Sequence, residues 1–264
     1  MYDFHQDKKR YYEIQYKNAR HSILPFVQPF LDLNRECQVM EIGSAEGGNL
    51  KPFAEAGCTC TGIELSAPRI QLAEEFASTL VKKGKIRFIH SDIHNINPAD
   101  HPEMRFDLIF LKDVLEHIHN QEKMIRALKA FLKPGGIIFF GFPSWYMPFG
   151  GHQQMCHSRF LSRLPWIHLL PMPAYKTILR WINRHPRQNE GLIEIKKTGI
   201  TIRRFERICR SEKLIILKKQ FYLVPPIYIY KFNIKTRKLP AIIGKIPLLR
   251  EFFTTSAYYV ISNE

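Results

Sequence analysis

The chain of 264 residues is long enough for one large domain, and its 45% apolar and 12% aromatic residues exclude a disordered or fibrous protein. The formal net charge of +15 lies entirely in the second half: residues 1–143 carry 18 basic and 18 acidic side chains, whereas residues 144–264 carry 21 basic and 6 acidic ones. This asymmetry favours an anionic partner, although a well-solvated basic surface would give the same count.

The cysteines and the N-terminus indicate a reduced, intracellular protein. Five cysteines are an odd number, and Cys37, Cys58 and Cys60 lie in or beside expected strands, so we expect buried thiols. No second pair of ligands stands at zinc-finger spacing, and we predict no metal site. The first residues, MYDFHQDKKRYY, contain no apolar segment of a signal peptide. No run of about 18 apolar residues occurs, so we expect a cytoplasmic protein, with peripheral membrane contact as an open alternative.

The expected elements alternate between helices and strands. Helical spacing over residues 8–33, broken by Pro25 and Pro29, predicts one or two N-terminal helices. The elements that follow are strand 37–42, helix 47–56, strand 58–64, helix 66–81, strand 85–90, strand 106–111, helix 121–132, a turn at 133–136 and strand 137–142. Residues 143–200 show no strand period. A helix over 201–211 and strands over 213–224 and 256–261 close the chain.

This spacing of strands and helices predicts the fold class. It requires an α/β, Rossmann-like, doubly wound and mostly parallel sheet of seven strands with helices on both faces. We expect a single domain over residues 1–264. Its parts are an N-terminal helical cap (1–36), a cofactor-binding core (37–143), a substrate lid inserted after strand five (144–200), and a closing helix with the last two strands (201–264).

Chemistry-bearing residues stand at the ends of the expected strands, where open α/β sheets bind ligands. Small residues form the turn after the first strand: Gly43, Ser44, Ala45, Gly47 and Gly48. Glu64 closes the second strand and could accept hydrogen bonds from both hydroxyls of a ribose. Asp92 closes the third strand and could accept from an adenine amino group. Residues 111–118 would form the floor and the acceptor side of the pocket.

Together these residues resemble the class I S-adenosylmethionine-dependent methyltransferases, and most closely the branch that includes small-molecule O-methyltransferases of quinone biosynthesis. The resemblance covers residues 37–142 and, more weakly, the closing strands. The family's acid followed by GxGxG reads Glu41-Ile-Gly43-Ser-Ala45-Glu-Gly47 here, with Ala45 in place of the middle glycine. LEHI and LKPGG also match the family in kind and place.

The resemblance implies S-adenosylmethionine as the cofactor and S-adenosylhomocysteine as its product, with Glu41 holding the methionine amino group. It implies cofactor contacts from Glu41, Gly43, Ser44, Ala45, Gly47, Gly48, Glu64, Leu65, Asp92, Ile93, Lys112 and Asp113. The competing interpretation is a nicotinamide dinucleotide site, which also uses an acid after strand two. Glu46 in the turn argues against it, because a carboxylate beside a pyrophosphate would be repulsive.

The implied reaction is methyl transfer to a small-molecule, lipid or glycan acceptor, with oxygen as the preferred acceptor atom. A hydroxyl acceptor profits from a general base, for which the candidates are His117, His152 and His157; each could instead serve only packing. A nucleophilic or metal-binding role for Cys156 has no supporting ligand nearby in the sequence.

The acceptor and the partners stay open. The aromatic and basic run 160–182 could be a lid with its own core, or could lie on an anionic membrane. Basic and aromatic residues around 228–238 also permit RNA or DNA, although the NPPY-like motif of amino-methylating nucleic-acid enzymes is absent. A cofactor-binding scaffold without catalysis is a third alternative. The sequence predicts no oligomeric state.

Overall fold

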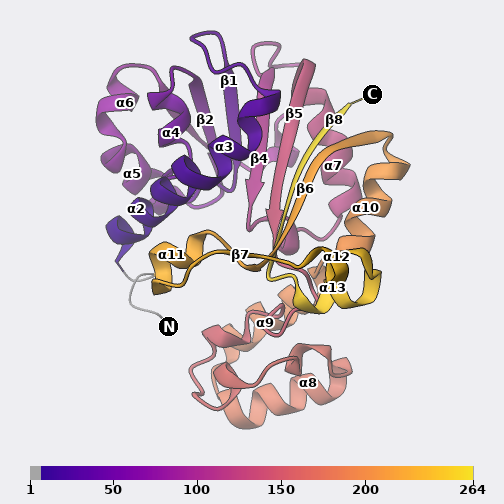
Figure 1. Ribbon diagram of the computed structural model, residues 1–264. Coiled ribbons are helices and arrows are strands. Elements are labelled where there is room, and N and C mark those ends of the chain that lie inside the picture. Colours follow the sequence, from indigo (N-terminus) through magenta and orange to yellow (C-terminus); the bar gives the residue numbers. More distant parts are fainter. Residues whose placement is uncertain (1–6, 264) are drawn as a thin grey trace.

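A computed structural model describes residues 7–263. Its centre is an eight-stranded sheet in the order β3-β2-β1-β4-β5-β8-β6-β7 (Figure 1). The strands are β1 Gln38–Ile42, β2 Thr59–Glu64, β3 Ile86–His90, β4 Phe106–Lys112, β5 Leu132–Phe142, β6 Leu214–Val224, β7 Arg237–Lys238 and β8 Ser256–Asn263. The five strands from β3 to β5 pair in parallel, and β8 runs antiparallel between β5 and β6. The predicted Rossmann-like α/β class is therefore confirmed.

The predicted count of seven strands was one too low. The additional strand is β7, whose two residues pair with Tyr222 and Val224 of β6 at the sheet edge. Both β7 residues are exposed and basic, so the sequence carries no apolar alternation that would mark a strand there. The N-terminal half of β5 was also misjudged: it takes in the turn predicted at 133–136, with an irregular register opposite Phe106 and Leu108.

The described residues form twelve α-helices, several of which cover the two faces of the sheet. They are α2 Lys8–Asn18, α3 Leu24–Val27, α4 Lys51–Glu55, α5 Ala67–Phe76, α6 Ser78–Lys82, α7 Gln121–Leu128, α8 Met172–Ile178, α9 Pro186–Thr198, α10 Ile202–Ser211, α11 Ile227–Phe232, α12 Ala241–Lys245 and α13 Pro247–Phe253. Ile125 of α7 and Phe205 of α10 belong to the apolar core on one face, and Phe26 of α3 and Phe53 of α4 to the core on the other. All five cysteines are buried free thiols, as expected.

The N-terminal helical cap is more continuous than its prolines suggest. Helical structure runs from Lys8 through a wide π turn at Ala19–Ile23 into α3, so Pro25 does not end it. Leu24 N–H donates to the carbonyl of Ala19, five residues earlier. A wider turn takes up the missing N–H and the bulk of a proline ring, which a regular α-helix cannot. Residues 1–6 of the predicted cap lie outside the residues that the structure describes.

Three predicted helix boundaries need correction. The helix expected from Gly47 begins only at Lys51, because Gly47 has a φ of +80° and its N–H closes a turn onto the carbonyl of Ser44. The helix expected over 66–81 is broken at Ala77 into α5 and α6. The helix expected to reach Leu132 ends at Leu128, followed by a 3-10 turn.

Residues 144–200 form a helical insertion at the lower end of the molecule (Figure 1). The segment has a small core of its own made by Cys156, Leu161, Ile167, Tyr175, Leu179 and Leu192. Among the described residues, no helix is both long and apolar enough to cross a bilayer. The insertion follows β5 and therefore begins at the strand end where ligands bind in such sheets.

Candidate active site

The glycine turn is tied to the neighbouring strand and is tightly packed. The N–H groups of Gly43 and Ser44 both donate to the carbonyl of Ile63 on β2, at 2.8 and 3.1 Å. Gly43 has a φ of +68°, and a Cβ there would lie 2.5 Å from a methyl group of Val114. A Cβ on Gly48 would lie 2.4 Å from the carbonyl oxygen of Tyr12 on α2. At both positions neighbouring parts of the protein already require a glycine. A bound cofactor would be a further reason for the small residues of this turn.

Glu64, at the end of β2, organises this turn. One carboxylate oxygen accepts the N–H of Ala45 at 2.9 Å, and the other accepts the N–H of Ser66 at 3.0 Å. Ala45 has a φ of +49°, in the left-handed region that favours glycine, at the position where the family motif carries one. The buried carboxylate retains free lone pairs, so it could also accept hydroxyl donors from a ribose.

Glu41, in β1, has a carboxyl group that the protein only half satisfies. One oxygen accepts from the side-chain amide of Asn49 at 2.7 Å, while the other is buried without a hydrogen-bond partner among residues 7–263. Burial raises the pKa of Glu41 well above its ordinary value, and the charge of Glu64 adds to this. The hydroxyl of Ser44 is likewise buried and unpartnered within the described chain. Two orphaned polar atoms beside the glycine turn fit a bound polar group such as an amino acid moiety.

The residues predicted around an adenosine also lie at this edge. Asp92 follows β3, and one of its carboxylate oxygens accepts the N–H of His94 at 2.9 Å, which caps the turn Ile93–Asn95. Ile93 is buried, whereas Leu65 is largely exposed just after β2. The N–H of Ser91 donates to the carbonyl of Glu64, which holds the ends of β2 and β3 together. Glu46, in the turn after β1, is buried, and its carboxylate forms an ion pair with Lys8 at 3.0 Å.

Charged side chains surround the end of β4. Lys112 forms an ion pair with Asp113, which has a φ of +56° and donates its N–H to the carbonyl of Gly141 at 2.7 Å. Desolvation, followed by the charge of Asp113, raises the pKa of Tyr11 to about 12. Desolvation lowers the pKa of Lys231 to about 8, while the charge of Asp113 opposes this shift. The Lys231 ammonium lies 5.3 Å from the ring centroid of Tyr11. Elements from both ends of the chain therefore meet at Asp113.

Two of the three candidate base histidines come together. The rings of His117 and His152 stack with their centroids 5.3 Å apart and an interplanar angle of 9°. Desolvation lowers the pKa of both, that of His152 to about 4, and each also feels the charge of Asp113. Glu116 joins them, and burial raises its pKa to about 8. His157 instead stacks on His185 in the insertion, with centroids 4.0 Å apart.

The comparisons with known proteins show the family. Residues 13–186 match the family described as a methyltransferase domain, which is well over half of the chain. The chain therefore belongs to the class I S-adenosylmethionine-dependent methyltransferases, as the motifs indicated. Enzymes of this family use S-adenosylmethionine, so the predicted enzyme class and cofactor are confirmed at the level of the family.

Curated relatives resemble parts of the chain. It is 31% identical over 105 residues to a ubiquinone biosynthesis O-methyltransferase of Actinobacillus pleuropneumoniae, a stretch that covers 39% of this chain and 44% of the relative. It is 24% identical over 175 residues to the tRNA 5-carboxymethoxyuridine methyltransferase of Escherichia coli, covering 64% of each chain. The matched stretches thus span less than two thirds of either relative.

Solved structures resemble nearly the whole fold. An S-adenosylmethionine-dependent methyltransferase from Clostridium acetobutylicum aligns with a TM-score of 0.57 at 14% identity, covering 94% of this chain and 92% of that chain. The geranyl diphosphate C-methyltransferase of Streptomyces coelicolor aligns with a TM-score of 0.58 at 13% identity, covering 92% and 79%. At these identities the likeness concerns the fold.

The sequence analysis assigned no individual role at the end of β4 to three residues that the fold brings there, namely Tyr11, Glu116 and Lys231. Tyr11 and Lys231 stand more than 200 positions apart, and no local pattern connects them. Glu116 was included only in the floor segment 111–118. Its signal was the acid–histidine pair Glu116-His117, whose chemistry becomes evident only when His152 is placed beside it.

Proposed function

We propose that this protein transfers a methyl group from S-adenosylmethionine to a hydroxyl oxygen of an amphiphilic small-molecule or lipid acceptor. The observation that carries the proposal is the meeting of two groups of residues at one edge of the sheet. Glu41 and Glu64 lie in or at the end of β1 and β2, and Asp113 and His117 follow β4. Since β1, β2 and β4 are parallel, their carboxyl ends share that edge.

The roles of the residues follow from their surroundings. When bound, S-adenosylmethionine supplies an electrophilic methyl group on sulfur. The free oxygen of Glu41 would accept the methionine ammonium group, and Glu64 would accept the ribose hydroxyls. Asp92 would accept from the adenine amino group, with Leu65 and Ile93 against the ring. His117 is the candidate to take the proton of an acceptor hydroxyl, and desolvation keeps its imidazole neutral and able to do so.

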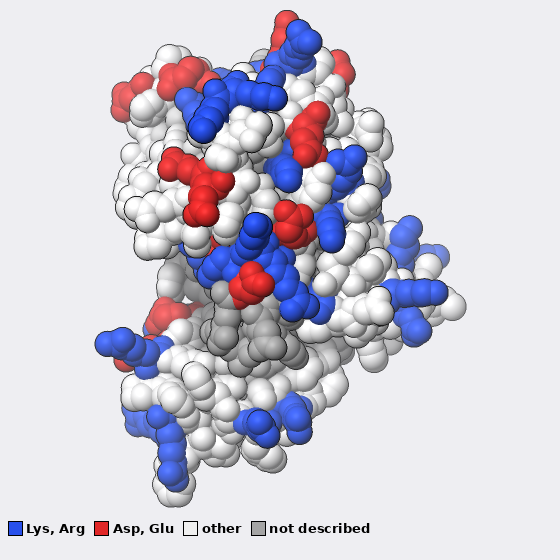
Figure 2. Space-filling view, turned by 90° about the vertical axis from the view of Figure 1, so that its left-hand side faces the viewer, with Lys and Arg blue, Asp and Glu red and all other residues white. Residues whose placement is uncertain are grey.

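Exposed apolar side chains support an amphiphilic acceptor. On α12 and α13, Ile242 is 78% and Leu248 is 54% exposed. In the insertion, Trp181 is 77% and Phe160 is 64% exposed. Figure 2 shows that the lower part of the molecule, where the insertion lies, is largely uncharged surface with basic side chains and few acids. Apolar side chains among basic ones are typical of surfaces that contact anionic membranes.

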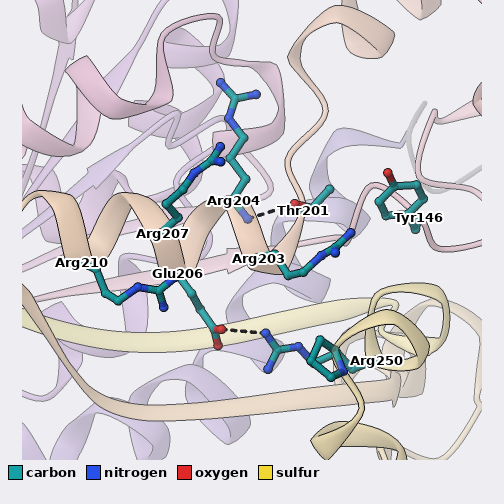
Figure 3. A pocket seen from close by; sticks show the side chains of 9 residues that line it. Tyr146, Thr201, Arg203, Arg204, Glu206, Arg207, Arg210 and Arg250 are labelled. Carbon is teal, nitrogen blue, oxygen red and sulfur yellow. Dashed lines mark hydrogen bonds and ion pairs between the residues drawn. The ribbon is translucent and has the colours of Figure 1, made fainter.

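A basic pocket lies next to this apolar surface. A cavity of about 500 Å³ is lined by Tyr146, Thr201, Arg203, Arg204, Glu206, Arg207, Arg210, Pro247 and Arg250. Figure 3 shows four of the arginines along α10, with Arg250 reaching Glu206 from α13. The same helix α13 presents Leu248 and Leu249 to solvent. Arginines bind phosphate oxygens, so this pocket suits the headgroup of an anionic lipid or the phosphate of an acceptor.

The cofactor part of the proposal is tested by a thermal-shift titration with S-adenosylhomocysteine and, in parallel, with NAD. A ligand at about 100 times its Kd stabilises the native state by about 2.7 kcal/mol. We expect a shift with S-adenosylhomocysteine alone. A shift with NAD alone, or with neither ligand, would overturn the cofactor assignment.

The acceptor part is tested by sedimentation with vesicles of neutral and of anionic phospholipid. We expect the protein to sediment with anionic vesicles, and the double variant Leu248→Asp, Leu249→Asp to lose most of this binding. Ile215 on β6 is 45% exposed and belongs to neither helix, so Ile215→Asp is the matched control. Equal recovery of all three proteins with both kinds of vesicle would contradict a membrane-derived acceptor.

RNA is the second candidate acceptor. One relative is a tRNA methyltransferase, and the arginine pocket could equally hold a phosphate backbone. Binding to RNA would weaken steeply with rising salt, because each neutralised phosphate releases a counterion. Strong, salt-sensitive RNA binding together with no vesicle binding would favour this candidate.

A further inference from the structure

The pocket between α10 and α13 holds more positive charge than its acid neutralises. Four arginines of α10 and Arg250 of α13 line it, together with the carboxylate of Glu206 (Figure 3). That carboxylate is already engaged. It accepts from Arg250 at 2.7 Å, from Lys219 at 2.9 Å and from the hydroxyl of Tyr259 at 3.0 Å. Glu206 is therefore neutralised by Arg250 and Lys219, and does not balance the arginines of α10.

The arginines of α10 find little compensation elsewhere. Arg203 lies 3.6 Å from a carboxylate oxygen of Glu251, but the same carboxylate already accepts three shorter hydrogen bonds, at 2.7, 2.8 and 3.0 Å. In the part of the chain that the structure describes, no acidic side chain forms an ion pair with Arg204, Arg207 or Arg210. Three guanidinium groups therefore border one pocket without a carboxylate partner.

The spacing of these arginines along the helix adds repulsion. Arg203 and Arg207 are four positions apart, and Arg207 and Arg210 are three positions apart, so each pair is adjacent on the surface of α10. Like charges at these spacings destabilise a helix. An anion bound among the guanidinium groups would offset that repulsion and would supply the acceptors that the protein itself does not provide.

The arginines border a hollow rather than a flat surface. The cavity of about 500 Å³ lies in the size range of pockets that hold small molecules. The N-terminus of α10 is not the source of donors, because Thr201 accepts the N–H of Arg204 and Glu251 accepts those of Ile202 and Arg203. The guanidinium groups are the available donors. A pocket of this size admits one anionic group, whereas a nucleic-acid strand needs an extended basic groove.

The number of donors indicates which anion fits. A guanidinium group donates two parallel hydrogen bonds to phosphate oxygens. A phosphodiester, as in most phospholipid headgroups, leaves few unesterified oxygens for such pairs. A terminal phosphate has three acceptor oxygens and about two negative charges, and a diphosphate has more of both. Arg204, Arg207 and Arg210 together therefore suit a terminal phosphate or a diphosphate better than a diester.

We propose that the pocket between α10 and α13 binds a terminal phosphate or diphosphate group. Binding of this group stands independently of methyl transfer, whereas its role as an anchor for the acceptor rests on the function proposed above. With the phosphate among the arginines, the apolar part of the acceptor could lie along Leu248 and Leu249, which α13 exposes next to Arg250. The acceptor is thereby narrowed from an amphiphile in general to a phosphorylated one.

Calorimetric titration of the purified full chain with pyrophosphate and, separately, with inorganic phosphate tests the pocket. We expect pyrophosphate to bind one per chain and more tightly than phosphate. Arg207→Ala and Arg210→Ala should each weaken this binding about 10-fold or more, since each removes charge-assisted hydrogen bonds. Both side chains are exposed, so both variants should fold. Arg187→Ala, at an exposed arginine of α9, is the matched control and should bind as wild type does. The proposal is wrong if pyrophosphate does not bind stoichiometrically, or if Arg207→Ala and Arg210→Ala bind it as tightly as Arg187→Ala does.

Sedimentation with vesicles distinguishes a lipid phosphate from a free one. Phosphatidylcholine vesicles carry either phosphatidic acid, which has a terminal phosphate, or phosphatidylglycerol, which is a diester. If the phosphate belongs to a lipid, Arg207→Ala should lose binding to the phosphatidic acid vesicles selectively. If Arg207→Ala loses pyrophosphate but sediments like wild type, the ligand is a free phosphorylated molecule. Binding of RNA without binding of pyrophosphate would overturn the proposal in favour of a nucleic-acid surface.

The titrations contain neither cofactor nor acceptor, so they do not depend on methyl transfer. Affinity for S-adenosylhomocysteine is measured separately on the same proteins. Pyrophosphate binding without S-adenosylhomocysteine binding would refute the proposed function alone. The reverse result would refute the phosphate pocket alone.

Discussion

The hydroxyl of Ser144 donates to the carboxylate of Glu251 at 2.7 Å, which joins the first residue of the insertion to α13, 107 positions later. The same fully buried carboxylate accepts the N–H groups of Ile202 and Arg203, at 3.0 and 2.8 Å. An acid at a helix N-terminus satisfies N–H groups that the helix cannot. Glu251 therefore holds the insertion, α10 and α13 in one arrangement.

Replacing Glu251 should destabilise the fold strongly. Glu251→Ala leaves a buried hydroxyl and two N–H groups without an acceptor, and we expect the free energy of unfolding to fall by about 3 kcal/mol. Urea unfolding followed by circular dichroism measures the change. Glu190→Ala, at an exposed position of α9, serves as the control and should stay within about 0.5 kcal/mol of wild type. Equal midpoints for the two variants would show that the Glu251 network contributes nothing.

Replacing Ala45 with glycine should stabilise the protein. Its φ of +49° costs about 1–2 kcal/mol relative to glycine, and the greater entropy of glycine in the unfolded chain returns about 0.5–1 kcal/mol of that. We expect Ala45→Gly to raise the free energy of unfolding by about 0.5–1 kcal/mol and the Tm by about 2 °C. Thermal unfolding measures this.

The matched control is the same chemical change in a helix. Ala127→Gly, in α7, should destabilise by about 1 kcal/mol. If Ala45→Gly lowers the Tm as Ala127→Gly does, the left-handed strain at Ala45 does not exist.

Glu64 offers a test of the cofactor site that, unlike a substitution at Gly43, adds no atoms to the packed turn. Any side chain at Gly43 would collide with Val114, so a loss of binding there could come from the fold alone. Glu64→Ala removes a carboxylate that we assign to the ribose, and S-adenosylhomocysteine should bind about 10–100-fold more weakly, since hydrogen bonds to a charged group contribute about 1.5–3 kcal/mol. Calorimetry measures the affinity. Glu75→Ala on α5 is the control; an unchanged Kd for Glu64→Ala would remove Glu64 from the site.

The sequence predicts the fold class and the central strands better than it predicts where individual helices and strands begin and end. Strands such as β4 are buried on both faces, and such continuous apolar runs can be recognised from the sequence alone. Pro25 misled because proline only disfavours a regular α-helix, and a π turn at Ala19–Ile23 accommodates it. β7 was missed because two exposed basic residues become a strand only through the edge of β6 that they pair with.

The candidate site likewise has one part that can be predicted from the sequence and one part that cannot. Glu41 lies in β1, Ala45 in the turn that follows it and Glu64 at the end of β2, so their order along the chain already places them together. The group around Asp113 draws on Tyr11, His152 and Lys231, which meet only after the whole sheet has formed. No local spacing encodes that meeting. His157 was a candidate base together with His117 and His152, but its ring stacks on His185 within the insertion, away from the His117–His152 pair.

His168 should make the stability of the insertion depend on pH. It is fully buried, its Nε2 lies 2.8 Å from the carbonyl oxygen of Trp145, and its Nδ1 faces the side-chain amide of Gln153 at 3.4 Å. Burial lowers the pKa of His168 to about 4, against 6.5 for an ordinary histidine. Below pH 6.5 the unfolded chain therefore binds a proton that the native chain does not, so the stability falls as the pH falls. The loss is complete near pH 4 and is about 2 kcal/mol between pH 7 and pH 5.

Urea unfolding at pH 7 and pH 5, followed by tryptophan fluorescence, measures this dependence. All three tryptophans, Trp145, Trp166 and Trp181, lie in the insertion and report on it. His168→Gln cannot take up a proton, so its stability should change by about 2 kcal/mol less than that of wild type over this interval. His185→Gln, at an exposed histidine, should follow wild type. Because other groups titrate in both proteins, only the difference between the slopes counts, and identical slopes for wild type and His168→Gln would mean that His168 is not buried as a neutral imidazole.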